Sequence, residues 1–360
     1  MGKRREQTEG LWEEKQVLLT AAAPLLSAWF RENARPLPWR QNPTPYSILV
    51  SETMLQQTRV EAVLKYYPRF MEAFPSLEAL AEASEERVLK LWEGLGYYSR
   101  ARNLQKAARL CMDDYAAALP QSAKELKKLP GVGAYTAGAV ASLAFGEAAP
   151  AVDGNVLRIL ARCFADWRDV LQPAVKKEAE QLLGGVLEQL EDPGLFNEAL
   201  MELGELVCLA GGKPRCRHCP WQDGCRGLAE GCQEDLPNRG TPKARRKEKK
   251  TVLLLRHGGK TALEKRPEKG LLAGLYGFPM LEGHLDRGDI LPWLGSYGIP
   301  FGPLRPMGSA GHVFTHVEWE MEAWETETEA ELPGYIYADR EEMETVYALP
   351  SAFRVFKEKV

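Results

Sequence analysis

The first 230 residues carry a repeating pattern in which apolar side chains recur at helical spacing. Residues three and four apart share one face of a helix, so the pattern predicts amphipathic helices around a common core. Prolines and glycines interrupt it, as at Phe74-Pro75-Ser76 and Asp192-Pro193-Gly194, and mark turns. The segments expected to be helical are 16–30, 46–72, 77–93, 101–118, 122–129, 135–145, 154–165, 174–190 and 195–208.

Beyond residue 248 the long helical repeats give way to short apolar runs. Thr251–Leu255 is apolar and β-prone, and a Gly258-Gly259 turn follows it. The other expected strands are Val313–Val317, Trp319–Trp324 and Tyr335–Tyr337. Strands with helices between them predict an α+β domain from about 249 to 360. A chain of 360 residues is long enough to hold two such cores.

Charge is distributed unevenly along the chain. The net charge of −4 would argue against a nucleic-acid partner, but residues 239–250 hold seven basic residues and one acid. Residues 318–346, in contrast, are crowded with glutamate. A local positive field decides binding to phosphate, so 239–250 is either a phosphate-binding stretch or a solvated linker.

The sequence contains no run of about 18 apolar residues, which excludes a membrane span. The charged N-terminus is followed by glutamates and no apolar segment, so it is not a signal peptide. We therefore expect a bacterial cytoplasmic protein with no membrane partner.

Four of the seven cysteines lie close together in the sequence. Cys208, Cys216, Cys219 and Cys225 have the spacing C-x7-C-x2-C-x5-C. An odd number of cysteines without a secretion signal argues against a disulfide framework. Four thiolates in so short a loop can enclose a zinc ion or a cubane cluster. A zinc ribbon usually has two Cys-x2-Cys pairs, whereas this loop has one.

The stretch Leu129–Gly138 places two glycines in a tight turn between two expected helices. Gly131 and Gly133 permit positive φ and close approach of another backbone. The helix that follows presents free N–H groups, which form a site for an anion such as a DNA phosphate. Such a contact carries no sequence information. Taken alone, the same residues also fit an ordinary corner between helices.

Glu52 and Asp153 are the two carboxylates that the pattern singles out. Glu52 shares a largely apolar helix face with Ile48 and Leu55, so burial should raise its pKa and suit it to general-acid catalysis. Asp153 starts the next helix beside Asn155, and in ionised form it could stabilise positive charge on a sugar. N-glycosidic cleavage requires such a pair. Singly, Glu52 also fits a solvated helix residue, and Asp153 an N-cap.

The hairpin together with Ala151–Val156 resembles the helix–hairpin–helix motif of the endonuclease III superfamily of DNA glycosylases. Three further strings resemble the adenine DNA glycosylases of the MutY type: SETMLQQT at 51–58, LPWR at 37–40 and GLGYYSRARNL at 94–104. This resemblance implies a multidomain fold in which an all-α helix-hairpin-helix glycosylase domain with an iron–sulfur cluster loop precedes an α+β Nudix-like domain. The resemblance implies a helical domain at 8–232, a basic linker at 233–248 and an 8-oxoguanine recognition domain at 249–360. Within the helical domain it implies a six-helix-barrel module at about 36–145 and an N-terminal and iron–sulfur module at 8–35 and 146–232.

The same resemblance implies a role for each site residue. The catalytic set is Glu52, Asp153, Tyr135 and Asn155; the adenine-binding set is Arg40, Glu198, Trp39 and Leu55; the DNA-binding set is Gln57, Tyr97, Gly131, Val132, Gly133 and Thr136. Glu52 would protonate a ring nitrogen of adenine, and Asp153, oriented by Asn155, would stabilise the sugar cation. Gln57 and Tyr97 would wedge into the duplex where the base is flipped out.

Two departures from related patterns refine these expectations. Bifunctional relatives have a lysine immediately before the hairpin threonine, and its amine forms a Schiff base with the sugar. Tyr135 occupies that position here, so we expect hydrolysis without strong lyase activity. The family's four cysteines have the spacing C-x6-C-x2-C-x5-C and bind a 4Fe–4S cluster, whereas this chain has one extra residue between Cys208 and Cys216.

The C-terminal region resembles the Nudix-like domain of the same glycosylases, which inspects 8-oxoguanine. Residues 271–280 are apolar where a Nudix hydrolase would carry Mg²⁺-binding glutamates, so hydrolysis there is not expected. Phe314, Thr315 and His316 match the loop that contacts 8-oxoguanine, in which the middle residue is commonly serine. The alternative for these three residues is an ordinary strand in a half-buried sheet.

The sequence therefore predicts a monomeric, monofunctional adenine glycosylase that acts on duplex DNA with adenine opposite 8-oxoguanine or guanine. It would associate with the nucleoid when bound to DNA. One alternative is a thymine- or uracil-mismatch glycosylase of the same superfamily. Another is a metal-stabilised protein that binds damaged DNA without excising a base, against which the presence of both Glu52 and Asp153 argues.

Overall fold

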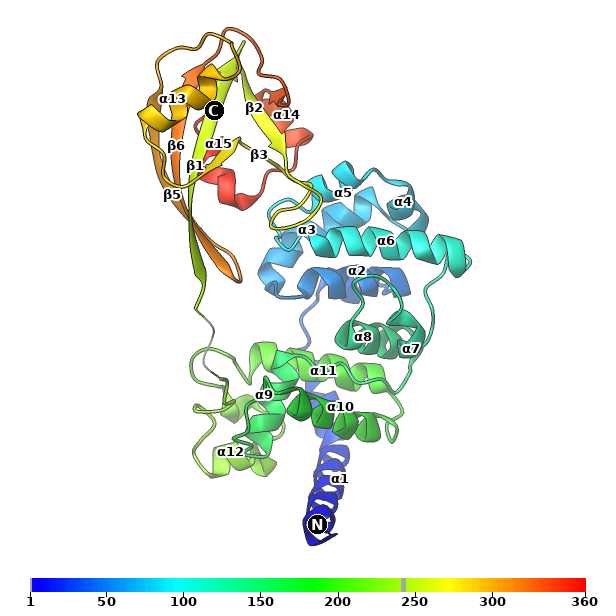
Figure 1. Ribbon diagram of the computed structural model, residues 1–360. Helices are drawn as coiled ribbons and strands as arrows, with labels where there is room; N and C mark the ends of the chain where they lie inside the picture. The colour runs from blue at the N-terminus through cyan, green and yellow to red at the C-terminus, as the bar shows by residue number, and fades with distance from the viewer. Residues whose placement is uncertain (1, 241–243) are drawn as a thin grey trace. The chain divides into compact units, whose positions relative to one another are not determined.

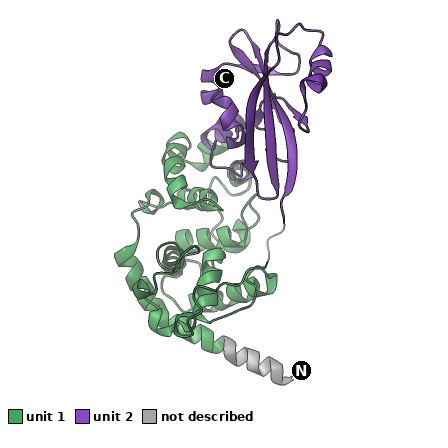
Figure 2. Ribbon diagram, turned by 90° about the vertical axis from the view of Figure 1, so that its left-hand side faces the viewer, with its two compact units in different colours: residues 1–82, 103–241 green, residues 83–102, 242–360 purple. Residues whose placement is uncertain are grey.

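The chain folds into two compact units. The computed structural model describes residues 2–240 and 244–360, with side chains described from residue 13 onward. Unit 1 comprises residues 1–82 and 103–241, and unit 2 comprises residues 83–102 and 242–360 (Figure 2). Within the described residues, no helix has both the length and the apolar character needed to span a bilayer.

Unit 1 is helical, as Figure 1 shows. Its α-helices are α1 (Gly2–Asn33), α2 (Pro45–Leu55), α3 (Val60–Ala73), α4 (Leu77–Glu82), most of α6 (Ser99–Asp114), α7 (Ala123–Leu126), α8 (Ala134–Phe145), α9 (Gly154–Cys163), α10 (Pro173–Leu187), α11 (Pro193–Leu206) and α12 (Arg226–Ala229). Short 3-10 turns occupy η1 (Pro38–Arg40), η2 (Cys216–His218) and η3 (Gln222–Gly224). Two segments predicted as single helices, 46–72 and 77–93, are each divided into two.

Two central helices of unit 1 are buried on nearly every side. Helix α2 buries its residues from Tyr46 to Met54, and α8 buries those from Thr136 to Ser142. A helix that is apolar all round belongs inside a core, and α8 packs against both α2 and α11. Glu52 on α2 is therefore carried into the interior by the helix itself.

Helix α8 can lie close to the chain segment that leads to Asp153 because residue 138 is glycine. A Cβ atom at Gly138 would lie 2.1 Å from the carbonyl oxygen of Pro150. The segment ending at Asp153 then begins α9, with the Asp153 side chain accepting a hydrogen bond from the Val156 N–H at 2.8 Å. Gly138 thereby helps to determine where this carboxylate lies.

Replacing Gly138 with alanine should lower the free energy of unfolding of unit 1 by about 1–3 kcal/mol, because the methyl group would overlap the Pro150 carbonyl. Gly184→Ala in α10 is the matched control, since a Cβ there meets no atom within 4 Å. In a helix interior the control should be neutral or stabilising by about 0.5–1 kcal/mol. Denaturant unfolding measures both, and equal losses in the two variants would contradict this account.

Unit 2 is built around a seven-stranded mixed sheet with the order β3-β2-β1-β6-β5, in which β4 pairs with β1 and β7 with β2. The strands are β1 (Arg246–His257), β2 (Lys260–Lys265), β3 (Tyr276–Gly277), β4 (Met280–Glu282), β5 (Arg305–Val313), β6 (Val317–Glu327) and β7 (Ile336–Ala338). Its helices are α5 (Glu85–Leu91), α13 (Arg287–Gly295), α14 (Arg340–Thr345), η4 (Ser351–Phe353) and α15 (Arg354–Lys357). The long pair β1 and β6 is parallel, and the other pairs are antiparallel.

The sheet of unit 2 separates two apolar cores. Alternation along β1 directs Val252 and Leu254 to one core and Leu253 and Leu255 to the other, and all four are fully buried. Because both faces are covered, β1 contains a continuous apolar run, which is the pattern that predicted a strand at 251–255.

The structure corrects two expectations for this part of the chain. Strand β1 begins at Arg246, inside the basic stretch expected to be a linker. The predicted strand Val313–Val317 is wrong, because β5 ends at Val313 and β6 begins at Val317. Residues 314–316 form the connection between these antiparallel strands, with the Phe314 N–H donating to the Val317 carbonyl at 2.8 Å.

Residues 83–102 group with the C-terminal part of the chain, although the sequence analysis assigned them to the helical domain. The Lys90 ammonium on α5 donates to the carbonyl oxygens of Met343 at 2.9 Å and Tyr347 at 3.0 Å. The Arg102 guanidinium donates to the Ala273 carbonyl at 2.6 Å. Contacts between residues so distant in sequence leave no local pattern that could have predicted them.

Candidate active site and the family of the chain

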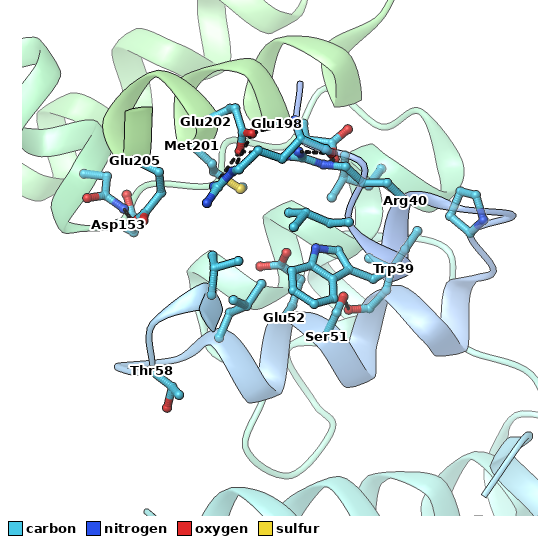
Figure 3. A pocket seen from close by; sticks show the side chains of 18 of the residues that line it. Trp39, Arg40, Ser51, Glu52, Thr58, Asp153, Glu198, Met201, Glu202 and Glu205 are labelled. Carbon is cyan, nitrogen blue, oxygen red and sulfur yellow. Dashed lines mark hydrogen bonds and ion pairs between the residues drawn. The ribbon is translucent and has the colours of Figure 1, made fainter. Parts of the chain in front are cut away.

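Unit 1 contains a pocket of about 970 Å³ whose walls come from η1, α2, α8, α9 and α11. Figure 3 shows Trp39 and Glu52 on one side and Arg40, Glu198 and Glu202 opposite, with Asp153 and Glu205 at one end. The remaining lining residues are Arg35, Leu37, Pro43, Ile48, Ser51, Leu55, Thr58, Val60, Tyr135, Leu143, Asn155 and Met201. The pocket thus joins the proposed catalytic and adenine-binding sets, which come from distant parts of the sequence.

Glu52 is the buried acid of this pocket. Glu52 is only 4% exposed, and its Oε2 atom has no hydrogen-bond partner among the described residues. Burial raises the pKa of Glu52 to about 7, and the nearby Glu198 and Asp153 carboxylates act in the same direction. A buried oxygen without a protein partner, on a carboxyl group that is protonated near neutral pH, is suited to donating a proton to a bound ligand.

Asp153 combines a structural and a chemical position. Its Oδ1 accepts from the Val156 N–H at 2.8 Å and thus caps α9, while its Oδ2 accepts from the Asn155 amide at 3.0 Å. Burial raises the pKa of Asp153 above its ordinary value, and these hydrogen bonds oppose the rise by favouring the charged form. The Asp153 side chain therefore both caps α9 and provides a carboxylate of the pocket.

Tyr135, in the first turn of α8, lines the same pocket as the two carboxylates. Its hydroxyl donates to the Met201 sulfur at 3.4 Å. Burial raises the pKa of Tyr135 well above its ordinary value, and the charges of Glu52 and Asp153 raise it further. The Tyr135 phenol is therefore neutral near pH 7.

The wall opposite Glu52 is an ion-pair network. The Arg40 guanidinium donates to Glu198 at 2.5 Å and to Glu202 at 3.1 Å. The Nε and Nη2 atoms of Arg35 also donate to Glu202, both at 2.8 Å. Burial opposes ionisation of Glu202, but the hydrogen bonds from Arg35 and Arg40 outweigh it and hold the pKa at about 2. This anion fixes both arginines in the wall.

Arg35 and Glu202 did not emerge from the sequence analysis as site residues. Glu198 and Glu202 stand four residues apart on α11, so they share one helix face. That spacing was the available signal for Glu202, because two carboxylates on one face of a buried helix require cationic partners. Trp39, which is 7% exposed, and Leu55 line the pocket between these polar groups.

The two predicted wedge residues share an uncommon backbone conformation. Gln57, directly after α2 in unit 1, has φ of 55°, and Tyr97 in unit 2 has φ of 48°. Left-handed backbone at residues other than glycine is rare and concentrates at functional sites. Both side chains are exposed, and Tyr97 packs over the Arg100 guanidinium at 5.5 Å.

Only one of the two hairpin glycines, Gly131, has the positive φ and the close neighbour that the sequence predicted for both. Gly131 has φ of 78°, and a Cβ atom there would lie 2.6 Å from the Asn103 Cβ. Gly133 instead has φ of −86° and is the N-cap of α8, with no side-chain capping bond. Val132 is buried, and the buried Thr136 hydroxyl is held by the Gln56 amide at 3.0 Å. The N–H groups at the start of α8 are therefore not covered by a cap.

The cysteines line a second cavity in unit 1, of about 410 Å³. Cys208, Cys216, Cys219 and Cys225 all contribute to it, together with the fifth cysteine, Cys163. Within the described residues, no three such side chains are close enough to share a single metal ion. Four thiols on the wall of one apolar cavity provide sulfur donors of the kind that bind zinc or an iron–sulfur cluster.

A chain of hydrogen bonds connects the cysteine cavity to the pocket. The buried Arg158 guanidinium donates to the Cys208 carbonyl at 2.8 Å and to the Asn155 amide oxygen at 2.9 Å. Asn155 in turn donates to Asp153. A Cβ atom at Gly204 would lie 2.8 Å from the Asn155 Cβ, so this region is closely packed. The cysteine loop thereby supports the orientation of Asp153.

The predicted 8-oxoguanine loop lies in unit 2 together with Tyr97. The hydroxyl groups of Thr315 and Tyr97 are 3.0 Å apart and hydrogen-bonded. Phe314 packs edge-on against Trp319, with ring centroids 4.9 Å apart, and turns its ring toward the core. Thr315 and His316 are exposed, so they are the members of the trio available to a ligand.

Comparison with known proteins identifies the family. Residues 50–185 match the HhH-GPD superfamily of base excision DNA repair proteins, and residues 251–359 match the NUDIX domain. The adenine DNA glycosylase of Homo sapiens is 34% identical, and the similarity covers 94% of this chain and 74% of that relative. This chain belongs to the adenine DNA glycosylases. The enzyme of Buchnera aphidicola is 32% identical over 81% of this chain and 82% of the relative.

Two solved structures are each similar to about three fifths of this chain. A thermostable thymine-DNA glycosylase is 28% identical with a TM-score of 0.52, covering 61% of this chain and 98% of that one. An endonuclease III in a non-covalent complex with DNA is 25% identical with a TM-score of 0.50, covering 60% and 97%. The predicted family, the helical glycosylase domain and the Nudix-like domain are confirmed, and the enzyme is a DNA-binding glycosylase of base excision repair.

The pKa of Glu52 predicts how this glycosylase responds to pH. Glu52 must be protonated to act as an acid, so kcat/KM for adenine release should fall about tenfold per unit as the pH rises beyond about 7. Asp153 must be ionised, and burial raises its pKa, so the rate should also fall on the acidic side, at a higher pH than for an ordinary aspartate. A rate profile measured across the folded range of pH should be bell-shaped, and a flat alkaline limb would contradict the acid role.

Proposed function

We propose that this adenine DNA glycosylase is monofunctional and removes adenine paired with 8-oxoguanine or guanine in duplex DNA. The observation that supports it most is the pocket in which a protonatable Glu52 faces Asp153, Arg40 and Glu198. The pocket also places the Trp39 and Leu55 side chains beside these polar groups, so a purine flipped out of the duplex would meet apolar walls there. The Nudix-like unit carries the exposed Thr315 and His316 for contact with the opposite base.

The proposed reaction begins with proton transfer from Glu52 to a ring nitrogen of adenine. The N-glycosidic bond then breaks, its electron pair leaves with the base, and positive charge develops on the sugar. The ionised Asp153, held by Asn155 and the Val156 N–H, stabilises that charge, as carboxylates do in glycoside hydrolysis. Water adds at the sugar carbon and completes the hydrolysis. Arg40 and Glu198 hold the adenine during these steps.

Absence of strong lyase activity is part of the proposal. A lyase of this superfamily requires an amine that attacks the sugar and forms a Schiff base. Tyr135 holds the corresponding position beside Glu52 and Asp153, and its neutral phenol cannot form that adduct. The strand should therefore stay intact after the adenine is released.

The four cysteines are proposed to hold a 4Fe–4S cluster. The apolar cavity that Cys208, Cys216, Cys219 and Cys225 line fits such a group, and the extra residue in the first spacing lies in the loop before Cys216. The Arg162 guanidinium donates to the Cys208 sulfur at 3.3 Å, as is favourable for a thiolate ligand. When bound, the cluster would supply a cross-link that orders the loop whose Cys208 carbonyl accepts from Arg158 of α9.

A single-turnover assay tests the proposed function. The substrate is a duplex with one 8-oxoguanine:A pair, and G:A, T:G and U:G duplexes are compared with it. Adenine release that is fastest opposite 8-oxoguanine, with no covalent DNA adduct after borohydride reduction, is the expected result. No adenine release would refute the proposal, and a trapped adduct would refute its monofunctional part.

The second candidate is a thymine-mismatch glycosylase, favoured by the likeness to the thermostable thymine-DNA glycosylase. That likeness covers 61% of the chain, whereas the human adenine DNA glycosylase matches 94%. The T:G duplex in the assay distinguishes the two directly. A monomeric state and a bacterial cytoplasmic location, associated with the nucleoid, stay predictions from the sequence.

A further inference from the structure

A hollow of about 880 Å³ opens on the sheet of unit 2 at the start of β1. Three of its lining residues, Arg246, Glu248 and Lys250, belong to the part of the basic stretch that forms β1. The hollow is lined by Arg246, Glu248, Lys250, Arg266, Gly270, Leu271, His316, Val317 and Trp319. None of these residues belongs to the adenine pocket of unit 1.

Strand geometry explains why basic side chains gather there. Side chains alternate along β1, so Arg246, Glu248 and Lys250 share one face, and the parallel register places Glu248 beside Trp319. Glu248 is the acid of the lining, and it is already engaged. It accepts from Arg246 at 2.9 Å and from the Trp319 indole at 3.0 Å, and it is paired with Lys250 at 3.1 Å.

Arg266 is the cation of the hollow that has no counter-charge in contact with it. Its guanidinium is half-buried and lies over the Trp319 ring at 5.5 Å. Its Nε donates to the Leu271 carbonyl at 3.3 Å, while its two Nη groups make no hydrogen bond or ion pair with any described residue. Arginine presents these groups as a planar fork that matches phosphate oxygens, and stacking on an indole restricts its motion before any ligand arrives.

The hollow adjoins the turn that carries the 8-oxoguanine contact. His316 lines it and directly follows Thr315, whose hydroxyl bonds to the exposed Tyr97 within the same unit. Arg246 donates its backbone N–H to the His316 carbonyl at 3.1 Å, so the basic start of β1 is attached to this turn. A DNA strand in contact with Thr315 would bring its backbone phosphates within reach of these cations.

We propose that this hollow binds a backbone phosphate of the DNA strand that Thr315 contacts, with Arg266 as the principal donor and Arg246 at the rim. The proposal rests on the proposed function, because it assumes that unit 2 meets the strand opposite the adenine. A phosphate contact positions the strand and carries no base specificity, so Arg266 contributes equally to damaged and undamaged duplexes. An open hollow beside an exposed turn suits a continuous strand better than an enclosed mononucleotide.

The test compares Arg266→Ala with Arg340→Ala, an exposed arginine of α14 in the same unit that lies outside the hollow. Binding is measured to a duplex in which 8-oxoguanine faces 2′-fluoro-2′-deoxyadenosine, whose glycosidic bond resists cleavage, and to an undamaged duplex. Arg266→Ala should weaken both about five- to twentyfold and reduce the slope of log K against log salt by about 1. Arg340→Ala should leave affinity and slope unchanged. An unchanged slope in Arg266→Ala would overturn the proposal.

Neutral methylphosphonates, placed one at a time along the 8-oxoguanine strand, locate the contact. One position should weaken binding by the wild-type enzyme and have no further effect on Arg266→Ala. If every position acts alike on both proteins, the phosphate is not held by Arg266. Arg246→Ala at the exposed rim provides a second variant should Arg266→Ala lower the thermal unfolding midpoint, and it should reproduce a smaller loss of affinity and slope.

A free nucleotide is the competing occupant. Titration with dGMP should show no binding that Arg266→Ala removes, and saturable binding that duplex DNA cannot displace would overturn the proposal in favour of a nucleotide site. The catalytic proposal is judged separately, by adenine release at saturating enzyme. That rate should be the same in Arg266→Ala and the wild type, so normal release with an unchanged salt slope rejects the phosphate site alone.

Discussion

Glu52→Gln is expected to lower the single-turnover rate of adenine release by roughly 10²–10⁴-fold, the range in which general-acid catalysis contributes. Glutamine has the size of the protonated acid but no proton to transfer to the leaving base. Because Glu52 Oε2 has no hydrogen-bond partner among the described residues, the amide disrupts no protein contact at that atom. Affinity for the duplex and the unfolding midpoint should therefore remain close to those of the wild type.

The control for this variant is Glu72→Gln, which makes the same change at an exposed position of α3. Its rate and its pH profile should match the wild type. In Glu52→Gln the residual activity should also lose the alkaline limb that the Glu52 pKa of about 7 imposes. Retention of full activity, or of that limb, would assign the acid to another residue.

Asp153→Asn is expected to reduce adenine release by roughly 10²–10³-fold, the loss seen when one group that stabilises transition-state charge is removed. Asparagine is as good an N-cap as aspartate, so α9 should keep the bond from the Val156 N–H. The substitution therefore removes the negative charge and the hydrogen bond from the Asn155 amide, and leaves the capping bond. The measured quantity is the single-turnover rate at saturating enzyme.

Asp192→Asn is the matched control, because Asp192 caps α11 by accepting from the Leu195 N–H at 2.9 Å. It makes the same exchange at a helix N-cap outside the pocket. Its activity should equal that of the wild type, and both variants should unfold within about 1 kcal/mol of it. Equal losses of activity in the two variants would mean that Asp153 acts through helix stability and not through its charge.

The helices were predictable where one face is apolar and the other polar, because that contrast produces a periodic pattern. Helix α9 is such a case, and its predicted range of 154–165 differs from Gly154–Cys163 only at the end. The periodic pattern continued across Gln57, so it did not show that 46–72 is two helices; the break depends on a left-handed residue with no glycine to mark it. Short strands such as β3 and β4 depend on pairing with β2 and β1, which sequence patterns do not record.

Local sequence could point to Glu52 and Asp153 because each stands in a distinctive string. It could not place Arg35 against Glu202, since these residues are 167 positions apart and meet only through the packing of α11. The bond between Tyr97 and Thr315 spans 218 positions and depends on the course of two separate chain segments. Long-range ion pairs and hydroxyl contacts of this kind emerge from tertiary structure alone.

The discontinuous composition of unit 2 limits how substrate preference can be exchanged between relatives. Its sheet comes from residues 242–360, but α5 and the Tyr97 loop come from 83–102, and unit 1 residues 103–241 lie between them in the chain. A chimera that takes only residues 242–360 from another glycosylase would change the segment whose Met343 carbonyl accepts from Lys90. It would also change the segment whose Thr315 hydroxyl bonds to Tyr97. Residues 83–102 and 242–360 would therefore have to be exchanged together, and amino-acid changes in one stretch should be accompanied by compensating changes in the other.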